Sequence, residues 1–266
     1  MYSKSQLASK WFQYYIRASS GRGHGVHSPF VFELIREVFN DDRDYYAYKL
    51  IETVKKTLLQ DDRILQVKDP GAGSGIKKEH SKKKISDIAG TVVSDQKFGR
   101  LLFRLANFYR AGTIIELGTS LGISASYLAS ADTGSRIITI EGSPPIAGIA
   151  KETFEKLKLN NISQVIGNFE DRLPDLIATN PPADLVFIDG NHRKKPVMEY
   201  FEQFMNRISP SSVIIIHDIH WSREMEEAWE LIQKHPGVKM SIDIFSAGLV
   251  FFRTEFRVKQ HFTIRF

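Results

Sequence analysis

Acidic and imidazole side chains gather at the ends of two apolar runs in the second half of the chain. Asp189 and His192 follow the run DLVFI (184–188), and Asp218 follows the run SVIIIH (212–217). Carboxylate oxygens are good ligands for hard divalent cations, and histidine exchanges protons near neutral pH. These residue types therefore predict either a metal site or general base chemistry.

Two glycine-rich turns have the composition of a nucleotide-binding loop. The first is DPGAGSG (69–75) and the second is ELGTSLG (116–122). Such a turn needs a strand before it, a helix after it and an acid at the end of the next strand, which holds ribose hydroxyls. Only the second turn meets all three conditions, because Glu141 ends the strand that follows it. The first turn is followed by lysines and serines, so we expect a mobile loop there.

The second turn is also unusual for a phosphate site. Glu116 lies at its start, where a carboxylate would repel a pyrophosphate. A cationic ligand with a ribose and no phosphate suits this position better. S-adenosylmethionine, with its sulfonium and ammonium groups, is such a ligand.

The elements around these turns alternate between strand and helix from about residue 90 onward. Continuous apolar strands between helices are typical of a parallel sheet that is covered on both faces. Two strands joined by a tight turn, in VKMSIDIFSAGLVFFR, end the pattern. The sequence therefore predicts an α/β, Rossmann-like, doubly wound and mostly parallel seven-stranded sheet with an antiparallel C-terminal hairpin. The expected strands are 113–117, 136–140, 163–167, 184–188 and 212–217. The expected helices include 96–110 before the first strand, 145–159 and 196–208 between strands, and 222–235 after 212–217.

A helical segment precedes this domain. Apolar residues at helical spacing predict helices over 3–18, 29–39 and 45–60. We therefore expect an N-terminal cap or lid over 1–89, with a basic loop at 77–84, and a cofactor-binding domain over 90–266. The net charge of +5 comes entirely from the first 90 residues, where 16 Lys and Arg face 11 Asp and Glu.

The motifs resemble those of the class I S-adenosylmethionine-dependent methyltransferases. IIELGTSLGISASYLA is similar to the first motif of that family and ITIEGSP to the second, while DLVFIDGNH and VIIIHD resemble the catechol and caffeoyl-CoA branch of small-molecule O-methyltransferases. The resemblance implies that Glu116 and the following backbone cradle the methionine part, that Glu141 accepts the ribose hydroxyls, and that GNFED (167–171) contacts adenine. The cofactor-binding residues it implies are Glu116, Gly118, Thr119, Ser120, Gly122, Ser124, Glu141, Gly142, Asn168, Phe169, Glu170 and Asp189.

The resemblance leaves two mechanisms open. In the catechol-type family two aspartates and an asparagine hold magnesium; Asp189 and Asp218 match the aspartates, but Ile219 stands where the asparagine is expected. In the first mechanism these two aspartates bind a metal that activates the acceptor hydroxyl. In the second, no metal binds and a histidine is the base, with His192 as the first choice before His217 and His220. The predicted catalytic residues are Asp189, His192 and Asp218.

Composition limits the remaining alternatives. The chain has no cysteine, which excludes disulfides and thiolate chemistry and suits a reducing compartment. No apolar run is long enough for a membrane helix. We expect a cytoplasmic enzyme with a small-molecule hydroxyl acceptor, and a homodimer is compatible with the sequence. An RNA or tRNA methyltransferase using the basic N-terminal third, a non-catalytic cofactor-binding protein and a nicotinamide oxidoreductase are the less favoured interpretations.

Overall fold

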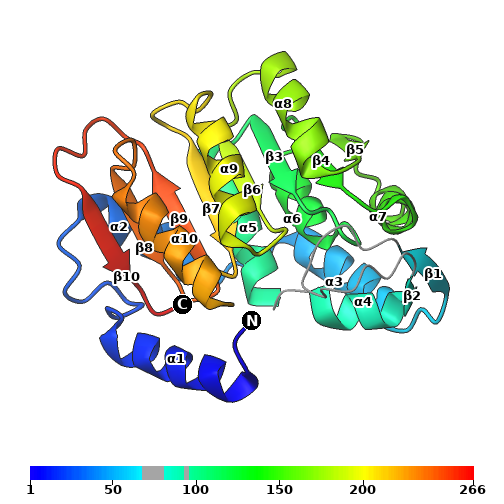
Figure 1. Ribbon diagram of the computed structural model, residues 1–266, viewed down its shortest axis with the longest axis horizontal. Coiled ribbons are helices and arrows are strands. Elements are labelled where there is room, and N and C mark those ends of the chain that lie inside the picture. The colour runs from blue at the N-terminus through cyan, green and yellow to red at the C-terminus, as the bar shows by residue number, and fades with distance from the viewer. Residues whose placement is uncertain (68–80, 93–95) are drawn as a thin grey trace. The chain divides into compact units, whose positions relative to one another are not determined.

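The computed structural model describes residues 1–67, 81–92 and 96–266 (Figure 1). The chain divides into two compact units, one formed by residues 42–179 and the other by residues 1–41 together with 180–266. This division differs from the predicted boundary at residue 89, and a lid role for the first 89 residues stays a prediction. Among the described residues, no helix has the length and apolar character that crossing a membrane requires.

The 42–179 unit contains a parallel run of three strands in the order β3-β4-β5. Leu117 of β3 pairs with Ile140 of β4, and four of the five β3 residues are buried. Continuous burial of this kind is expected where helices cover both faces of a parallel sheet. The elements are α3 (Tyr46–Leu58), β1 (Ile64–Val67), β2 (Ser81–Lys84), α4 (Ile85–Val92), α5 (Gln96–Tyr109), β3 (Thr113–Leu117), α6 (Ile123–Ala131), β4 (Arg136–Glu141), α7 (Pro144–Lys156), β5 (Ile162–Ile166) and α8 (Phe169–Thr179).

A separate two-stranded hairpin in this unit corrects part of the sequence interpretation. β1 and β2 pair antiparallel, with Val67 opposite Ser81. The last part of the basic stretch 77–84 is therefore a strand and not a loop, because its backbone pairs with β1 although its side chains are polar. The DPGAGSG turn and residues 77–80 lie outside the described residues.

The other unit contains a mixed run of five strands in the order β10-β8-β9-β7-β6. β9 pairs antiparallel with both β7 and β8, which confirms the predicted C-terminal hairpin. The elements are α1 (Lys4–Arg17), α2 (Pro29–Leu34), a π-helical turn η1 (Ile35–Phe39), β6 (Leu185–Ile188), α9 (Lys194–Met205), β7 (Val213–His217), α10 (Arg223–Lys234), β8 (Met240–Asp243), β9 (Ala247–Phe251) and β10 (Gln260–Thr263).

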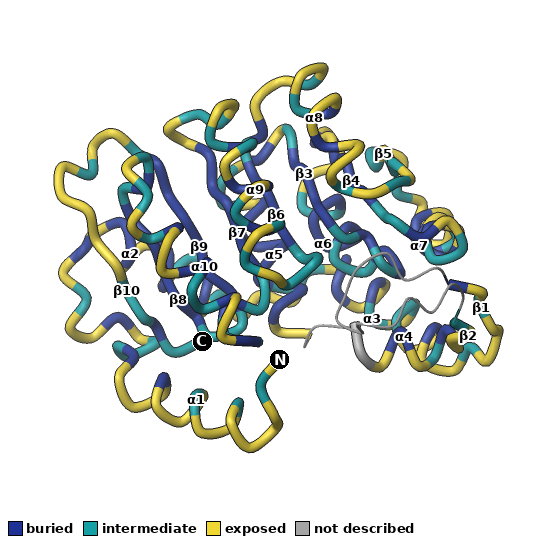
Figure 2. The backbone as a smooth tube through the Cα atoms, in the orientation of Figure 1, coloured by how far each residue is buried: buried dark blue, intermediate teal, exposed yellow. Residues whose placement is uncertain are grey.

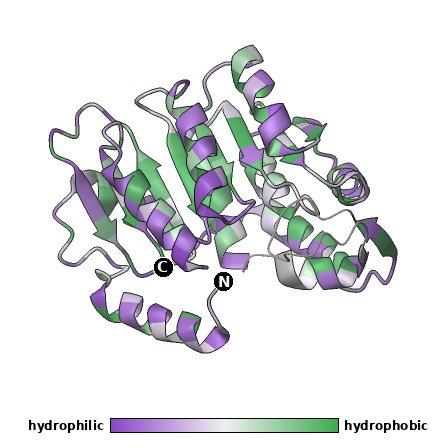
Figure 3. Ribbon diagram, viewed as in Figure 1, coloured by the Kyte–Doolittle hydropathy of each residue, from purple (hydrophilic) through white to green (hydrophobic). Residues whose placement is uncertain are grey.

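The edge strand β10 was not predicted. It has the sequence QHFT, pairs parallel with β8 and is hydrophilic, whereas β7 and β9 are hydrophobic (Figure 3). A short polar strand lacks the apolar signal that identified the others. The two units thus hold eight described strands besides the β1–β2 hairpin, one more than the seven expected.

Helices cover both faces of β9. A Cβ atom on Gly248 would lie 2.4 Å from the ring of Trp229 in α10, so this position requires glycine. Phe251, three residues further on, packs against Phe30 of α2 with ring centroids 5.1 Å apart. Residues three apart in a strand point to opposite faces, so α10 and α2 lie on opposite sides of the strand. All five residues of β9 are buried, and so are the first four of the neighbouring β7 (Figure 2).

The N-terminal residues of this unit are joined to its C-terminal strand. Ser19 forms a parallel bridge with Ile264, and its amide donates to the carbonyl of Thr263. α1 begins with a capping box, in which the Ser3 hydroxyl and the Gln6 side chain satisfy each other's backbone amides. The ring of Tyr14, on the buried side of α1, packs 5.2 Å from that of Phe245. α1 is therefore a packed part of the unit.

Two helix starts differ from the sequence predictions. α9 begins at Lys194 with Arg193 as its N-cap, so Pro196 is the third helical residue and not the first. Ser143 is the N-cap of α7 and Pro144 its first residue, one residue before the expected start at 145, and the Ser143 side chain makes no capping hydrogen bond. Instead the backbone amide of Ser143 donates to Glu141 at 2.9 Å.

Candidate active site

The turn between β3 and α6 has backbone angles that require glycine. Gly118 has φ +108° and Gly122 has φ +83°, both in the region that side chains disfavour. A Cβ on Gly122 would also lie 2.6 Å from the ring of Phe154. The amides of Gly118 and Thr119 donate to the carbonyl of Ile140, which fixes the turn against the end of β4.

Glu141 ends β4 and holds this turn from the other side. Its carboxylate accepts the backbone amides of Ser120 at 2.8 Å and Ser143 at 2.9 Å. Burial raises the pKa of Glu141, and these backbone hydrogen bonds oppose the shift. Each carboxylate oxygen has two lone pairs, so the group keeps capacity for a ligand hydroxyl. The turn and this acid fit a ribose-containing cofactor.

Glu116 lies deeper than its predicted role suggests. It is fully buried within β3, one residue before the strand ends. Its Oε2 accepts the Thr139 hydroxyl at 2.5 Å, and that hydroxyl also contacts the hydroxyl of Thr119. The carboxylate therefore joins β3, β4 and the glycine turn. Its contact with a cofactor ammonium group stays a prediction.

The remaining predicted cofactor residues lie on the same unit, except Asp189, which belongs to the other one. Ser124 is the second residue of α6 and is partly buried, and Gly142 follows Glu141 directly. Asn168 is exposed and its side-chain amide donates to Asp171 at 3.3 Å. Phe169 begins α8 and is partly exposed, so it is not a core residue, and Glu170 beside it is exposed. A partly exposed ring at the start of the helix that follows β5 is compatible with the predicted adenine contact.

In the other unit the structure brings together the two aspartates and two of the histidines. His217 Nδ1 lies 2.9 Å from Asp189 Oδ1 and 3.8 Å from Asp218 Oδ1. His192 Nε2 lies 3.7 Å from Asp189 Oδ1, and its Nδ1 lies 3.8 Å from Asp218 Oδ2. The predicted catalytic residues Asp189, His192 and Asp218 thus form one cluster, and His217 is its fourth member.

The charges of this cluster depend on each other. Burial alone would lower the pKa of His217, but the charge and hydrogen bond of Asp189, together with Asp218, raise it to about 9. Burial alone would raise the pKa of Asp189, but the charge and hydrogen bond of His217 outweigh it and lower the pKa. Near neutral pH His217 is therefore a cation between carboxylates. His192 is joined to them only at longer distances.

Three of the seven non-glycine residues with positive φ in the described part of the chain lie at this cluster. Asn191, His192 and Asp218 have φ values of +62°, +34° and +57°, which non-glycine residues rarely adopt. The Asn191 side chain is held by the hydroxyl of Tyr200. Strained residues persist where the surrounding structure fixes them, and such positions are frequent in active sites.

The cluster does not fit the magnesium site that the resemblance implies. Ile219, at the position of the expected asparagine, is fully buried and has no oxygen to offer. Asp189 Oδ1 already faces the His217 ring nitrogen at hydrogen-bond distance. Over the described parts of the chain, no group of three or more His, Asp and Glu side chains is arranged to hold a metal ion. We therefore assign no step to a metal.

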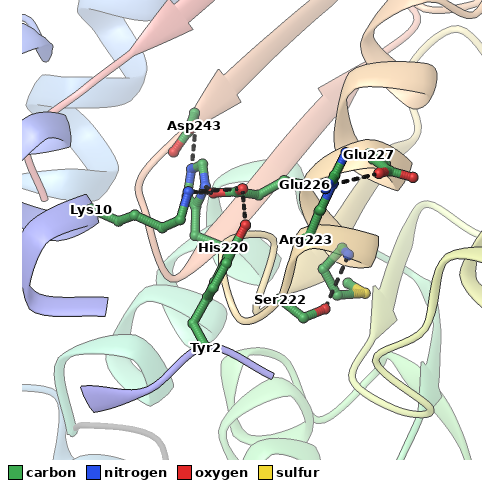
Figure 4. A network of polar contacts seen from close by, with 9 residues as sticks. Tyr2, Lys10, His220, Ser222, Arg223, Glu226, Glu227 and Asp243 are labelled. Carbon is green, nitrogen blue, oxygen red and sulfur yellow. Dashed lines mark hydrogen bonds and ion pairs between the residues drawn. The ribbon is translucent and has the colours of Figure 1, made fainter. Parts of the chain in front are cut away.

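A second polar network begins two residues after Asp218 (Figure 4). His220 lies between Asp243, whose Oδ2 is 2.8 Å from Nε2, and Glu226, whose Oε1 is 3.0 Å from Nδ1. Glu226 also accepts the Tyr2 hydroxyl at 2.7 Å and the Lys10 ammonium at 2.9 Å. The backbone amide of Tyr2 donates to the carbonyl of Trp221. The network ties α1 to the loop that follows Asp218.

Sequence reasoning missed this network. Tyr2 and Glu226 are 224 residues apart, and no local pattern relates them. His220 was considered as a base, but its ring nitrogens are directed at Asp243 and Glu226. His24 and His27, in the glycine-rich stretch before α2, are exposed, and His27 lines an open surface pocket with Phe30 and Arg253.

The glycine turn, the acid that ends β4 and the Asp–His cluster at the ends of β6 and β7 are the features on which the resemblance to S-adenosylmethionine-dependent methyltransferases depends. Residues 115–219 match the family model of a methyltransferase domain, from β3 to the residue after Asp218. This match confirms the resemblance on which the cofactor predictions depend.

Individual relatives and structures agree with this class. The chain is similar to a catechol O-methyltransferase of Niastella koreensis, with 32% identity over 124 residues that cover 46% of this chain and 55% of the relative. It spans about half the length of the curated relatives it matches. Among solved structures it shares its fold with the O-methyltransferase TomG of Streptomyces achromogenes in complex with SAM (TM-score 0.54, 23% identity, 63% and 82% covered). The O-methyltransferase of Bacillus cereus in complex with SAH has the same fold (TM-score 0.54, 20% identity, 79% and 92% covered). These neighbours confirm the predicted α/β, Rossmann-like, mostly parallel fold.

Proposed function

We propose that this chain is an S-adenosylmethionine-dependent O-methyltransferase that acts on the hydroxyl group of a small molecule. The observation that supports this most directly is the extent of the methyltransferase-domain match. It covers residues 115–219 and so includes the glycine turn, Glu141 and the Asp189–His192–His217–Asp218 cluster. The relative and the two solved structures described above are named O-methyltransferases.

The proposal assigns cofactor binding to the 42–179 unit. Glu141 accepts the ribose hydroxyls, and the backbone of Gly118 to Gly122 lies close to the ligand because no side chain intervenes at either glycine. Asn168, Phe169 and Glu170 are the proposed adenine contacts. When bound, S-adenosylmethionine supplies a methyl group on a positively charged sulfur, which makes the carbon electrophilic.

The proposal assigns the hydroxyl chemistry to the Asp–His cluster. His192 accepts the proton of the acceptor hydroxyl while the hydroxyl oxygen takes the methyl group, and the thioether is the leaving group. Asp189 and Asp218 lie within 4 Å of the His192 ring and orient it.

The acceptor is proposed at the level of class only. Catechol is the substrate named for one relative, so an aromatic hydroxyl is the first compound to test. The RNA interpretation depended on the basic stretch 77–84, and none of the relatives or structures described above supports it. The cytoplasmic location and the homodimer remain predictions.

Transfer of a radiolabelled methyl group to a panel of small hydroxyl compounds tests the proposal. We expect labelled product from at least one catechol-like acceptor, and loss of that product in His192→Asn. Transfer only to an amine or to RNA would contradict the proposal. His27→Ala, at an exposed histidine outside the cluster, is the control and should retain activity.

A further inference from the structure

The two carboxylates to which the sequence resemblance assigns a metal are bridged by a histidine in this chain. Asp189 follows β6 and Asp218 follows β7, and His217 is the last residue of β7. A single ring nitrogen of His217, Nδ1, faces both carboxylates, at 2.9 Å from Asp189 and 3.8 Å from Asp218. The imidazole thus lies where the two acids converge.

His192 completes the enclosure of the two acids. Its two ring nitrogens face different carboxylates, Nε2 toward Asp189 at 3.7 Å and Nδ1 toward Asp218 at 3.8 Å. All four side chains are largely shielded, with exposed fractions between 15% and 29%. Asp189 Oδ1 therefore has imidazole nitrogens of two residues as neighbours.

A divalent cation would have to displace these contacts. Magnesium requires near-octahedral oxygen ligands at about 2.1 Å and gives up its water reluctantly. Here the third protein oxygen is absent, because residue 219 is a buried isoleucine. The oxygen of Asp189 nearest to the convergence point is engaged by His217.

We propose that His217 takes the structural place of the metal ion, so that the cluster positions the acceptor and the base without a divalent cation. The inference rests on the proposed function. In it His217 is a positioning residue, since its hydrogen bond orients the Asp189 carboxylate and its ring lies 3.8 Å from Asp218, so that both acids face His192. Removing the imidazole leaves two shielded acids without their bridge and creates a cation site.

Binding of Mn²⁺ to the full chain, followed by electron paramagnetic resonance, tests this without any need for an acceptor. We expect wild-type protein to leave Mn²⁺ free at roughly millimolar concentration, and His217→Ala to bind it at least about tenfold more tightly. The additional change Asp218→Asn should abolish the gained binding. His27→Ala is the control and should behave as wild type.

Wild-type protein that binds Mn²⁺ at micromolar concentration, and loses that binding in Asp218→Asn, would overturn the inference. This result does not depend on the folding of His217→Ala. If an acceptor is found, EDTA should change the wild-type rate less than about twofold, whereas His217→Ala should lower kcat and leave the affinity for S-adenosylhomocysteine unchanged. A rate lost in EDTA and restored by Mg²⁺ would also overturn it.

The same experiments distinguish failure of the inference from failure of the proposed function. Absence of S-adenosylhomocysteine binding would remove the methyltransferase function and leave the Mn²⁺ result intact. Tight binding of both S-adenosylhomocysteine and Mn²⁺ by the wild-type protein would support the proposed function and overturn the inference about His217.

Discussion

At the scale of single residues, Glu141 combines burial with a carboxylate that still has capacity to accept hydrogen bonds. Glu141→Gln keeps the size of the side chain and removes its charge. We expect the affinity for S-adenosylhomocysteine to fall by roughly 10- to 100-fold, since hydrogen bonds to a charged group contribute about 1.5–3 kcal/mol. Calorimetric titration measures it. Glu155→Gln, at an exposed acid of α7, should change nothing, and an equal fall in both variants would contradict the assignment.

His192 is the residue expected to affect turnover without affecting the cofactor. His192→Asn should lower kcat by about 10²- to 10⁴-fold, the usual contribution of a general base. The affinity for S-adenosylhomocysteine should stay as in wild type, because His192 is not among the proposed cofactor contacts. Steady-state rates and calorimetry on the same preparation separate the two effects. A loss of affinity in place of turnover would assign His192 to binding.

His217 makes the free energy of unfolding depend on pH, and the direction of this dependence follows from its raised pKa. Its pKa is raised from 6.5 to about 9, so the stabilisation it contributes is complete below pH 6.5 and is lost as the pH rises through 9. The loss is at most about 3 kcal/mol. Urea unfolding of wild type and His217→Asn across this interval measures the loss. The two proteins are compared because the pKa of His220 is also raised, which adds a pH dependence that both proteins share. Parallel stability curves for the two proteins would contradict the assigned charge.

At the scale of elements, Glu226 of α10 joins the N-terminal helix to the loop after β7. Its carboxylate contacts Tyr2, Lys10 and His220 (Figure 4). In the hydrogen bonds described, the neighbouring Glu227 contacts only the side chains of Lys194 and Arg223. Glu226→Gln should release α1, and Glu227→Gln should not.

Limited proteolysis measures this release. We expect cleavage within the first 20 residues to become about tenfold faster in Glu226→Gln, which corresponds to about 1.4 kcal/mol of local stability. The conservative change Lys10→Arg should keep α1 resistant to cleavage, and Lys10→Met should make it more susceptible. Equal cleavage rates in Glu226→Gln and Glu227→Gln would show that the network does not hold the helix.

The elements found from the sequence are those with a strong local signal. Continuous apolar runs located β3, β4, β6 and β7 to within one residue at their ends, and the alternation with helices gave the fold class. β2 and β10 were missed because their residues are mostly polar and their pairing is with distant segments. Ser81–Lys84 is a strand only because β1 lies beside it.

The site shows the same limit. Asp189, His192 and Asp218 were found from their positions after apolar runs. The bridging role of His217 was not, because it depends on a contact between residues 28 positions apart. The Tyr2–Glu226 network was missed because its members come from opposite ends of the sequence.

At the scale of the whole molecule, the two units contribute different parts of the proposed chemistry. Residues 42–179 contain the proposed cofactor contacts other than Asp189, and residues 180–266 contain the Asp–His cluster. The methyltransferase-domain match includes residues of both units. It extends over residues 115–219 of the chain. Recognition of the cofactor is therefore the property that a single measurement tests best.

Calorimetric titration of the full chain with S-adenosylhomocysteine, once with Mg²⁺ and once with EDTA, is that measurement. Micromolar or tighter binding with the same affinity in both buffers is the expected result, because Glu141 and the glycine turn bind the cofactor and the Asp–His cluster needs no ion. Absence of binding in both buffers would contradict the proposed methyltransferase function.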